Sequence, residues 1–238
     1  MIIKKLKVIN FRNYNNAELL LSPNINIFCG NNAQGKTNLL ESIYFLSFTK
    51  SHRSFIDNTL IKSNEKFLKI VGIIKDNNLF DTKLEINLDN NKKSIYVDDN
   101  LYKKVSDYIT KLNIVIFYPE DLGIIKDSPN IRRRYINSEI SQYNNEYLII
   151  LNNYKKINKI RNEYLKKLNS DINLDKQYLF VINNYYIENA IKIYFIRNNF
   201  IKELNNIVEN IFYDLTNMSG FHLKYINSFN IEDFDMYS

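Results

Sequence analysis

Cysteine is nearly absent from this chain of 238 residues, and histidine is scarce. The single Cys29 has no second cysteine with which to form an intrachain disulfide, which fits a reducing compartment. Its position at the end of an expected core strand favours a small buried side chain over a nucleophile. Because His52 and His222 are the two histidines and neither lies in a close Cys/His cluster, the sequence argues against a zinc site.

Long apolar runs are also missing. No segment approaches the roughly 20 uncharged apolar residues that a membrane-spanning helix requires. Residues 1–14 place lysines inside a strand-like alternation and lack the apolar block of a signal peptide. With 45% apolar and 24% charged residues, the composition is that of a globular protein of one large or two small domains. We expect a cytoplasmic protein without a membrane partner.

The net charge of +6 is compatible with a nucleic-acid partner. The excess is moderate, and the abundance of Lys, Asn, Ile and Tyr is typical of an AT-rich coding bias that raises lysine without a functional cause. Charge alone therefore gives weak support.

What the chain does contain is a complete phosphate-binding loop, or P-loop. Its residues fill every fixed position of the pattern G-x-x-x-x-G-K-[ST] and are Gly30, Asn31, Asn32, Ala33, Gln34, Gly35, Lys36 and Thr37. Glycines let consecutive backbone N–H groups surround an anion, and the helix that follows directs its positive end at the phosphates. Lys36 supplies charge at the β- and γ-phosphates, and Thr37 offers a hydroxyl to Mg²⁺. The loop predicts binding of a nucleoside triphosphate.

The segments on either side of the loop predict the strand and the helix that it requires. Residues 24–29 alternate polar and apolar side chains, as a short strand entering a sheet core does. Residues 37–47 carry apolar side chains at helical spacing. The alternative is a Gly-Asn turn that merely connects a strand to a helix, but such a turn does not require Lys36 and Thr37 at these offsets.

Alternation elsewhere in the first 118 residues predicts a sheet. The expected strands are residues 1–10, 17–21, 68–74, 81–88 and 92–97. A turn at residues 11–15 joins the first pair, and Asp-Asn-Asn sequences at 76–78 and 89–91 separate the last three as a meander. Residues 113–117 form a short apolar run of the kind buried on both faces, closed by Pro119.

Glycine and proline disappear between Pro129 and Gly220, and apolar residues there take a helical period. Pro129 suits the first turn of a helix. Two stripes result, which consist of Tyr154, Ile157, Ile160, Tyr164 and Leu168, and of Ile182, Tyr186, Ile193, Phe200, Leu204, Ile207 and Ile211. A polar break at residues 169–171 predicts a long helical hairpin, although an ordinary bundle has the same periodicity. Residues 220–226 alternate like a strand that returns to a sheet.

Several of these segments together resemble the bacterial RecF family, which belongs to the chromosome-maintenance and recombination-repair branch of the ABC-class ATPases. They cover nearly the whole chain in colinear order and are residues 10–14, 30–41, 116–122, 126–135, 141–143 and 161–166. The resemblance implies an α/β fold with an ABC-type P-loop ATPase head, incomplete here, and an inserted α-helical arm. The head would occupy residues 1–127, the arm 128–218, and a return strand 219–238.

The resemblance also implies a function. Members of the family bind ATP with Mg²⁺, dimerise when ATP is bound, bind single-stranded, gapped or junction DNA, and load recombinase with RecO and RecR during the SOS response. Arg12 and Asn13 would lie close to the nucleotide, whereas the residues alone favour a solvated turn for Arg12. Complete members continue into a signature motif and the Walker B carboxylates, and the acidic residues at 231–235 lack the apolar strand that should precede such carboxylates. We therefore expect ATP binding and regard hydrolysis by this chain alone as doubtful.

Two basic groups are candidates for contact with DNA. Lys126, Arg132, Arg133 and Arg134 form the densest cluster, which suits phosphate contacts or ion pairs at the seam between head and arm. A second group decorates the first arm helix, where a solvated surface is the ordinary interpretation, and consists of Lys155, Lys156, Lys159, Lys166 and Lys167. Because no base-reading constellation is visible, any DNA binding should be sensitive to salt and nearly independent of sequence.

Two other functions remain open. The chain could be a non-catalytic DNA-binding or partner-docking fragment without a competent nucleotide site, because exposed sheet edges favour pairing with another chain. A nucleotide kinase is the second alternative. It predicts an arginine-bearing lid over the phosphate acceptor, which the long arm stripes and the arginine cluster fit poorly.

Overall fold

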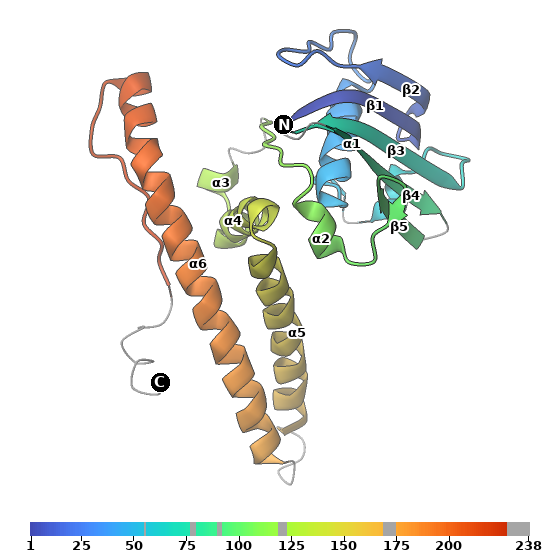
Figure 1. The fold of residues 1–238 in the computed structure, drawn as a ribbon. Helices are drawn as coiled ribbons and strands as arrows, with labels where there is room; N and C mark the ends of the chain where they lie inside the picture. Colours follow the sequence, from blue (N-terminus) through green and yellow to red (C-terminus); the bar gives the residue numbers. More distant parts are fainter. Residues whose placement is uncertain (55, 77–79, 90–91, 119–122, 169–174, 228–238) are drawn as a thin grey trace. The chain divides into compact units, whose positions relative to one another are not determined.

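The structure is a computed structural model that describes residues 1–54, 56–76, 80–89, 92–118, 123–168 and 175–227. The chain forms two compact units (Figure 1). The first unit comprises Met1–Ile131 with Ser141–Asn145, and the second Arg132–Ile140 with Glu146–Ser238. Among the described residues, no helix combines the length and the apolar character that crossing a membrane requires.

The first unit is built on a six-stranded sheet in which every pair of neighbours is antiparallel. Its order is β2-β1-β3-β4-β5-β6, with bounds β1 Ile2–Phe11, β2 Tyr14–Leu20, β3 Phe67–Lys75, β4 Asp81–Asp89, β5 Lys92–Val97 and β6 Asn100–Leu101. The strands predicted from alternation at residues 1–10, 17–21, 68–74, 81–88 and 92–97 are confirmed. Parts of the two Asp-Asn-Asn sequences, at 77–78 and 90–91, lie outside the described residues.

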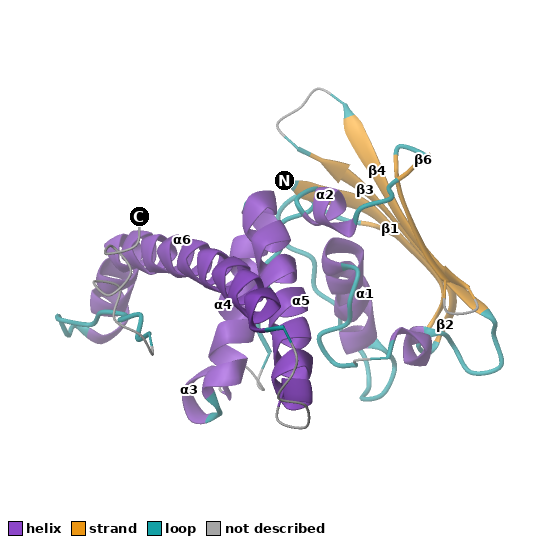
Figure 2. Cartoon of the chain, turned by 90° about the horizontal axis from the view of Figure 1, so that it is seen from below, coloured by secondary structure: helices purple, strands orange, loops and turns teal. Residues whose placement is uncertain are grey.

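Helix α1 (Lys36–Phe48) packs against one face of this sheet, as Figure 2 shows. Alternate residues of β1, β3 and β4 point toward the helix and are buried, among them Leu6, Val8, Leu68, Ile70, Leu84 and Ile86. Phe45 and Leu46 enter this core from α1 and are fully buried. At Gly72 on β3, a Cβ atom would overlap the Leu46 side chain, so glycine permits the close approach of helix and sheet.

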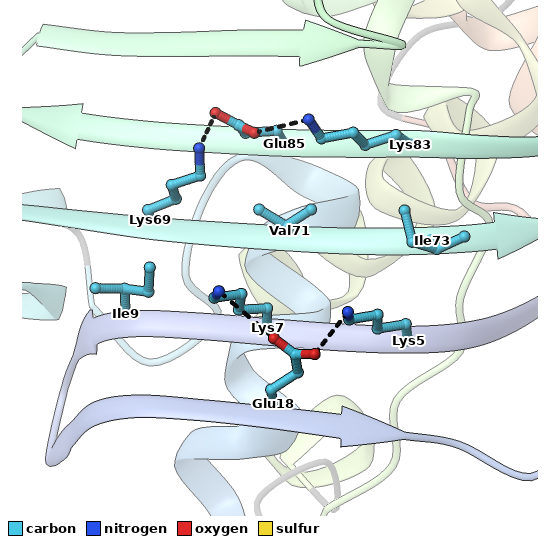
Figure 3. Close-up of a pocket in the computed structure, with 9 residues that line it drawn as sticks. All are labelled: Lys5, Lys7, Ile9, Glu18, Lys69, Val71, Ile73, Lys83 and Glu85. Atoms are coloured by element: carbon cyan, nitrogen blue, oxygen red, sulfur yellow. Dashed lines mark hydrogen bonds and ion pairs between the residues drawn. The ribbon is translucent and has the colours of Figure 1, made fainter.

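The opposite face of the sheet carries charged side chains over an apolar floor (Figure 3). Glu18 accepts ion pairs from Lys5 at 2.6 Å and Lys7 at 3.4 Å, and Glu85 accepts them from Lys69 at 2.6 Å and Lys83 at 3.5 Å. This alternation of buried and charged faces is typical of an antiparallel sheet with one side turned to water.

Short elements connect the sheet to the rest of the chain. They are the 3₁₀ turn η1 (Asp57–Leu60), α2 (Val105–Ile109) and α3 (Gly123–Lys126). The Tyr108 hydroxyl on α2 donates to the Leu46 carbonyl at 2.6 Å, and burial raises the pKa of that phenol. Ser47 Oγ donates to the Leu112 carbonyl at 2.6 Å, so α1 is tied to this region through polar as well as apolar contacts.

Two strands predicted in the first unit are not formed. The structure assigns no strand to residues 24–29 or 113–117, and Pro119 lies outside the described residues. Ile25 and Ile27 are 77% and 83% exposed, and Val115 and Phe117 are both 82% exposed. Cys29 is exposed too, so its predicted burial is wrong. A strand requires neighbours for its N–H and C=O groups, and none of the described strands pairs with either segment.

Long helices form most of the second unit. They are α5 (Asn145–Leu168), α6 (Lys176–Thr216) and residues 132–140 of α4 (Pro129–Tyr143), and Pro129 begins α4 as predicted. The helical hairpin is confirmed in α5 and α6. Tyr154 and Tyr186 stack with ring centroids 4.9 Å apart and hydroxyl oxygens 2.8 Å apart, and Arg161 Nε donates to Asn183 Oδ1 at 2.8 Å. The polar break predicted at residues 169–171 lies outside the described residues.

The strand predicted at residues 220–226 is not formed either. This segment lies along α6 instead, because Asn205 exchanges two hydrogen bonds with the Leu223 backbone at 2.7 and 2.9 Å. The Phe221 and Phe212 rings stack at 4.6 Å. Alternating side chains therefore pack on a helix here. The division into head, arm and return segment at residues 127 and 218 stays a prediction.

We expect Gly72→Ala to reduce the free energy of unfolding by about 1–3 kcal/mol, because the added Cβ overlaps the buried Leu46. Urea unfolding followed by circular dichroism measures this cost. The double variant Gly72→Ala/Leu46→Ala should cost less than the sum of the two single variants, since the shorter side chain removes the overlap. Additive costs would contradict the proposed contact.

Candidate nucleotide-binding site

The P-loop runs into α1 through residues with positive φ. Gly30 has φ 150°, Ala33 φ 66° and Gly35 φ 102°. The Leu39 N–H donates to the Gly35 carbonyl at 3.0 Å, which begins the helical hydrogen bonding directly after the loop. The loop thus ends at a helix N-terminus, where backbone N–H groups attract anions.

Lys36 folds back over this loop. Its Nζ donates to the carbonyl oxygens of Gly30 and Asn31, both at 2.7 Å. The ammonium group therefore stands over the residues whose backbone would surround a phosphate. The side chain of Thr37, the next residue of α1, is exposed.

The turn between β1 and β2 holds the loop from the side. Asn13 Nδ2 donates to the Gln34 carbonyl at 3.0 Å, and Asn13 Oδ1 accepts from Asn38 Nδ2 at 2.9 Å. The Tyr14 hydroxyl donates to the Gly35 carbonyl at 3.2 Å. Asn13 was predicted near a nucleotide by resemblance, and the structure brings it against the loop itself.

Arg12 faces α1 and binds the buried carboxylate of Glu41. Its Nε and Nη2 donate to the two Glu41 oxygens at 3.0 and 2.7 Å, and its Nη1 donates to the Thr59 carbonyl at 3.0 Å. Such a bidentate pair is stronger and more directional than a single ion pair. The interpretation of Arg12 as a solvated turn residue is therefore wrong, since it is ion-paired with a residue that is 0% exposed.

Two further side chains complete the surroundings of Glu41. Ser51 Oγ donates to Glu41 Oε1 at 2.5 Å, and Arg53 Nη1 lies 3.6 Å from Glu41 Oε2. Burial by itself would raise the pKa of Glu41, but hydrogen bonds from Arg12 and Ser51 and the charges of both arginines outweigh it. The Glu41 pKa consequently lies below its ordinary value, and the carboxylate is ionised at neutral pH.

An open hollow of about 450 Å³ adjoins this network. Its lining is predominantly polar and consists of Arg12, Asn13, Asn38, Thr59, Ile61, Lys62 and Ser63. Lys62 Nζ donates to the Asn13 carbonyl at 3.3 Å, so a second ammonium group lies beside the β1–β2 turn.

The predicted DNA-contact residues do not fall in one unit. Lys126 ends α3 in the first unit, whereas the arginines at 132, 133 and 134 lie in the part of α4 that belongs to the second. All four side chains are exposed. Consecutive residues of a helix point about 100° apart, so at most two of the three arginines can face the same phosphate backbone. The five lysines predicted on the outer face of α5 are exposed as well.

Sequence reasoning missed Glu41, Arg53 and Asn38 as parts of this site. One signal could have found Glu41. It shares a helical face with Phe45 and Phe48, both buried, and a carboxylate in such a row requires a cationic partner. The partners themselves come from distant positions, and spacing in the sequence does not indicate them.

A family model described as an AAA ATPase domain matches residues 1–230. The DNA replication and repair protein RecF of Clostridium botulinum (strain ATCC 19397 / Type A) is 42% identical over 246 residues, which cover 99% of this chain and 64% of that protein. RecF of Staphylococcus haemolyticus (strain JCSC1435) is 38% identical over 234 residues, covering 98% and 63%. The chain thus spans slightly less than two thirds of the length of these curated relatives.

Two solved structures resemble the fold. One is described as the "recombination mediator protein RecF-ATPrS in RecFOR pathway" and aligns with TM-score 0.87 and 31% identity over 91% of this chain and 58% of the other. The second, described as RecF-ATP in the same pathway, has TM-score 0.87 and 29% identity, with 95% and 63% covered. These matches confirm the predicted α/β fold class, an ATPase domain that combines an antiparallel sheet with long helices.

We expect Gly35→Ala to destabilise the loop more than Gly30→Ala. A Cβ at residue 35 would lie 2.6 Å from both terminal atoms of Asn13, which hydrogen bonds hold in place. A Cβ at residue 30 would meet the far end of the Gln34 side chain, which can turn away. Both variants also strain a positive φ, at a cost of order 1–3 kcal/mol. Hydrogen exchange of the loop amides and urea unfolding compare the two, and equal effects would contradict the fixed position of Asn13.

Proposed function

Because this chain belongs to the AAA ATPase domain family and, within it, to the RecF proteins of DNA replication and repair, we propose that it binds ATP at the P-loop and acts in DNA repair. The observation that carries the proposal is the loop geometry. Lys36 stands over the carbonyls of Gly30 and Asn31 at the N-terminus of α1, where an ammonium group and backbone N–H groups can bind phosphates together.

The remaining parts of the site support the same ligand. Asn13 and Tyr14 hold the loop carbonyls, and the adjoining polar hollow suits the ribose or base of a nucleotide. Thr37 would place its hydroxyl on the Mg²⁺ ion that accompanies ATP, since this small cation prefers oxygen ligands. The ion neutralises phosphate charge when it is bound. The proposal concerns binding of ATP and does not extend to its hydrolysis.

The proposed partner is DNA, single-stranded, gapped or at a junction. Support comes from the curated relatives, which are named for DNA replication and repair, and from the exposed basic residues of α4 and α5. RecR and RecO are further proposed partners, since both matching structures are described as part of the RecFOR pathway. An ATP-dependent second copy of the chain is proposed from the resemblance to the RecF family. With 64% of the length of such a relative, this chain need not carry all of these contacts.

A second candidate function is a partner-docking fragment without a competent nucleotide site. The exposed apolar side chains of Ile25, Ile27, Val115 and Phe117 favour it. The segment before the P-loop has no strand partner among the described residues, and a loop supported on only one side binds phosphate less rigidly. Nucleotide binding by the unmodified chain distinguishes the two candidates.

We expect Lys36→Ala to weaken ATP binding by at least about tenfold, because it removes the charge that meets the β- and γ-phosphates. Isothermal titration calorimetry with MgATP measures the affinity. Lys50→Ala is the matched control, since Lys50 is an exposed lysine beyond the other end of α1. An unmodified chain that does not bind ATP, or a Lys36→Ala variant that binds as well as the control, would count against the proposal.

For DNA, we expect affinity to fall steeply between about 50 and 200 mM salt, with a slope set by the number of phosphates contacted. Replacing the three arginines of α4 by glutamine should reduce this slope by about 1 to 2, since at most two face one backbone. Fluorescence anisotropy with single-stranded and gapped oligonucleotides measures both. Glutamine at Lys155, Lys156 and Lys159 tests the second basic group in the same way. A salt-independent affinity would exclude contacts led by phosphate.

A further inference from the structure

Glu41 is a fully buried carboxylate in α1, five residues after Lys36. It cannot touch a nucleotide, because none of its surface is accessible. A carboxylate that leaves water is costly unless charges and hydrogen bonds compensate for the lost hydration. Its presence so close to the P-loop therefore requires a structural reason.

Both arginines that approach Glu41 are connected to the P-loop through an asparagine. Arg12, bound at 2.7 and 3.0 Å, directly precedes Asn13, whose amide holds the Gln34 carbonyl. Arg53, at 3.6 Å from Glu41, donates through Nη1 to Asn38 Oδ1 at 3.1 Å.

These contacts form a closed circuit, because the side chain of Asn38 donates to that of Asn13. The circuit passes from Glu41 through Arg12 and Asn13 to Asn38, and through Arg53 back to Glu41. Its two members on α1, Asn38 and Glu41, lie on one face of the first two turns of the helix. Without the negative charge, the two guanidinium groups would repel each other. Each would keep a single hydrogen bond, from Arg12 to the Thr59 carbonyl and from Arg53 to Asn38.

We propose that Glu41 is a positioning residue of the nucleotide site, whose charge fixes Arg12 and Arg53. These arginines hold Asn13 against the P-loop, Arg12 through the adjoining backbone and Arg53 through Asn38. The inference rests on the proposed ATP binding. It names a residue that influences this binding although it does not touch the nucleotide. The affinity for ATP is then sensitive to a buried charge that the nucleotide never meets.

The chain offers a matched control in Glu85 (Figure 3). This carboxylate is 7% exposed, is paired with Lys69 at 2.6 Å and Lys83 at 3.5 Å, and accepts from Asn87 at 2.8 Å. As for Glu41, burial raises its pKa, but the hydrogen bonds and lysine charges outweigh this and lower it. Glu85 lies on the sheet face opposite α1, so its loss removes a comparable ion-pair network without touching the loop.

The experiment compares Glu41→Gln, Glu85→Gln and Arg53→Gln with the unmodified chain. Thermal unfolding first sets a temperature at which each variant is folded, and calorimetry with MgATP is then done at that temperature. We expect Glu41→Gln to raise the Kd for ATP about tenfold and Glu85→Gln to change it less than about twofold. Arg53→Gln should raise it several-fold at an unchanged melting temperature, because Arg53 is 47% exposed.

Each outcome decides a separate point. A folded Glu41→Gln variant with unmodified affinity overturns the inference, and so does a Glu85→Gln variant that loses as much affinity. If Glu41→Gln does not fold, Arg53→Gln decides, because an unchanged Kd in that variant overturns the circuit and a raised Kd supports it. Failure of the unmodified chain to bind ATP contradicts the proposed function itself, which these variants do not test.

Discussion

The packing of α1 on one face of the antiparallel sheet is the contact on which the loop geometry depends. Phe45 and Leu46 bury the C-terminal half of the helix, and Gly72 lets it approach the strands closely. This packing fixes the direction of the N-terminal half of α1. The P-loop connects directly to that end of the helix, so its position is fixed as well. Apolar burial therefore provides the rigidity, while polar contacts select the orientation of the loop.

The β1–β2 turn adds the second fixed point. Its two central residues point in different directions. Arg12 binds the buried Glu41, and Asn13 binds the P-loop. Arg12 adopts φ 53°, a conformation that side chains other than glycine rarely take, and its backbone N–H donates to the Leu60 carbonyl at 2.7 Å. The ion pair between Arg12 and Glu41 helps to hold the strained backbone of Arg12 in place. Strained backbone held by surrounding contacts is common at functional sites.

The sequence predicts local features well and pairing poorly. Alternation locates the five long strands, and the 3.6-residue period locates α5 and α6. Both patterns arise within a single element, because a strand or a helix buries the side chains of one face. The same alternation wrongly predicts strands at residues 24–29, 113–117 and 220–226, since a strand also needs a neighbouring strand, which is often distant in the sequence. For the site, the P-loop is readable from spacing alone. Helical spacing could also have indicated Glu41, but not its partners Arg12 and Arg53, because these reach it through three-dimensional contact.

The length of α6 has a mechanical consequence. At about 1.5 Å per residue, its 41 residues extend about 60 Å, whereas the 24 residues of α5 extend about 36 Å. If one end of α6 is held, a tilt of the helix axis by about 5° displaces the other end by about 5 Å. Asn205 holds the Leu223 backbone alongside this helix. A small rotation at one end of α6 thus produces a large displacement at its other end.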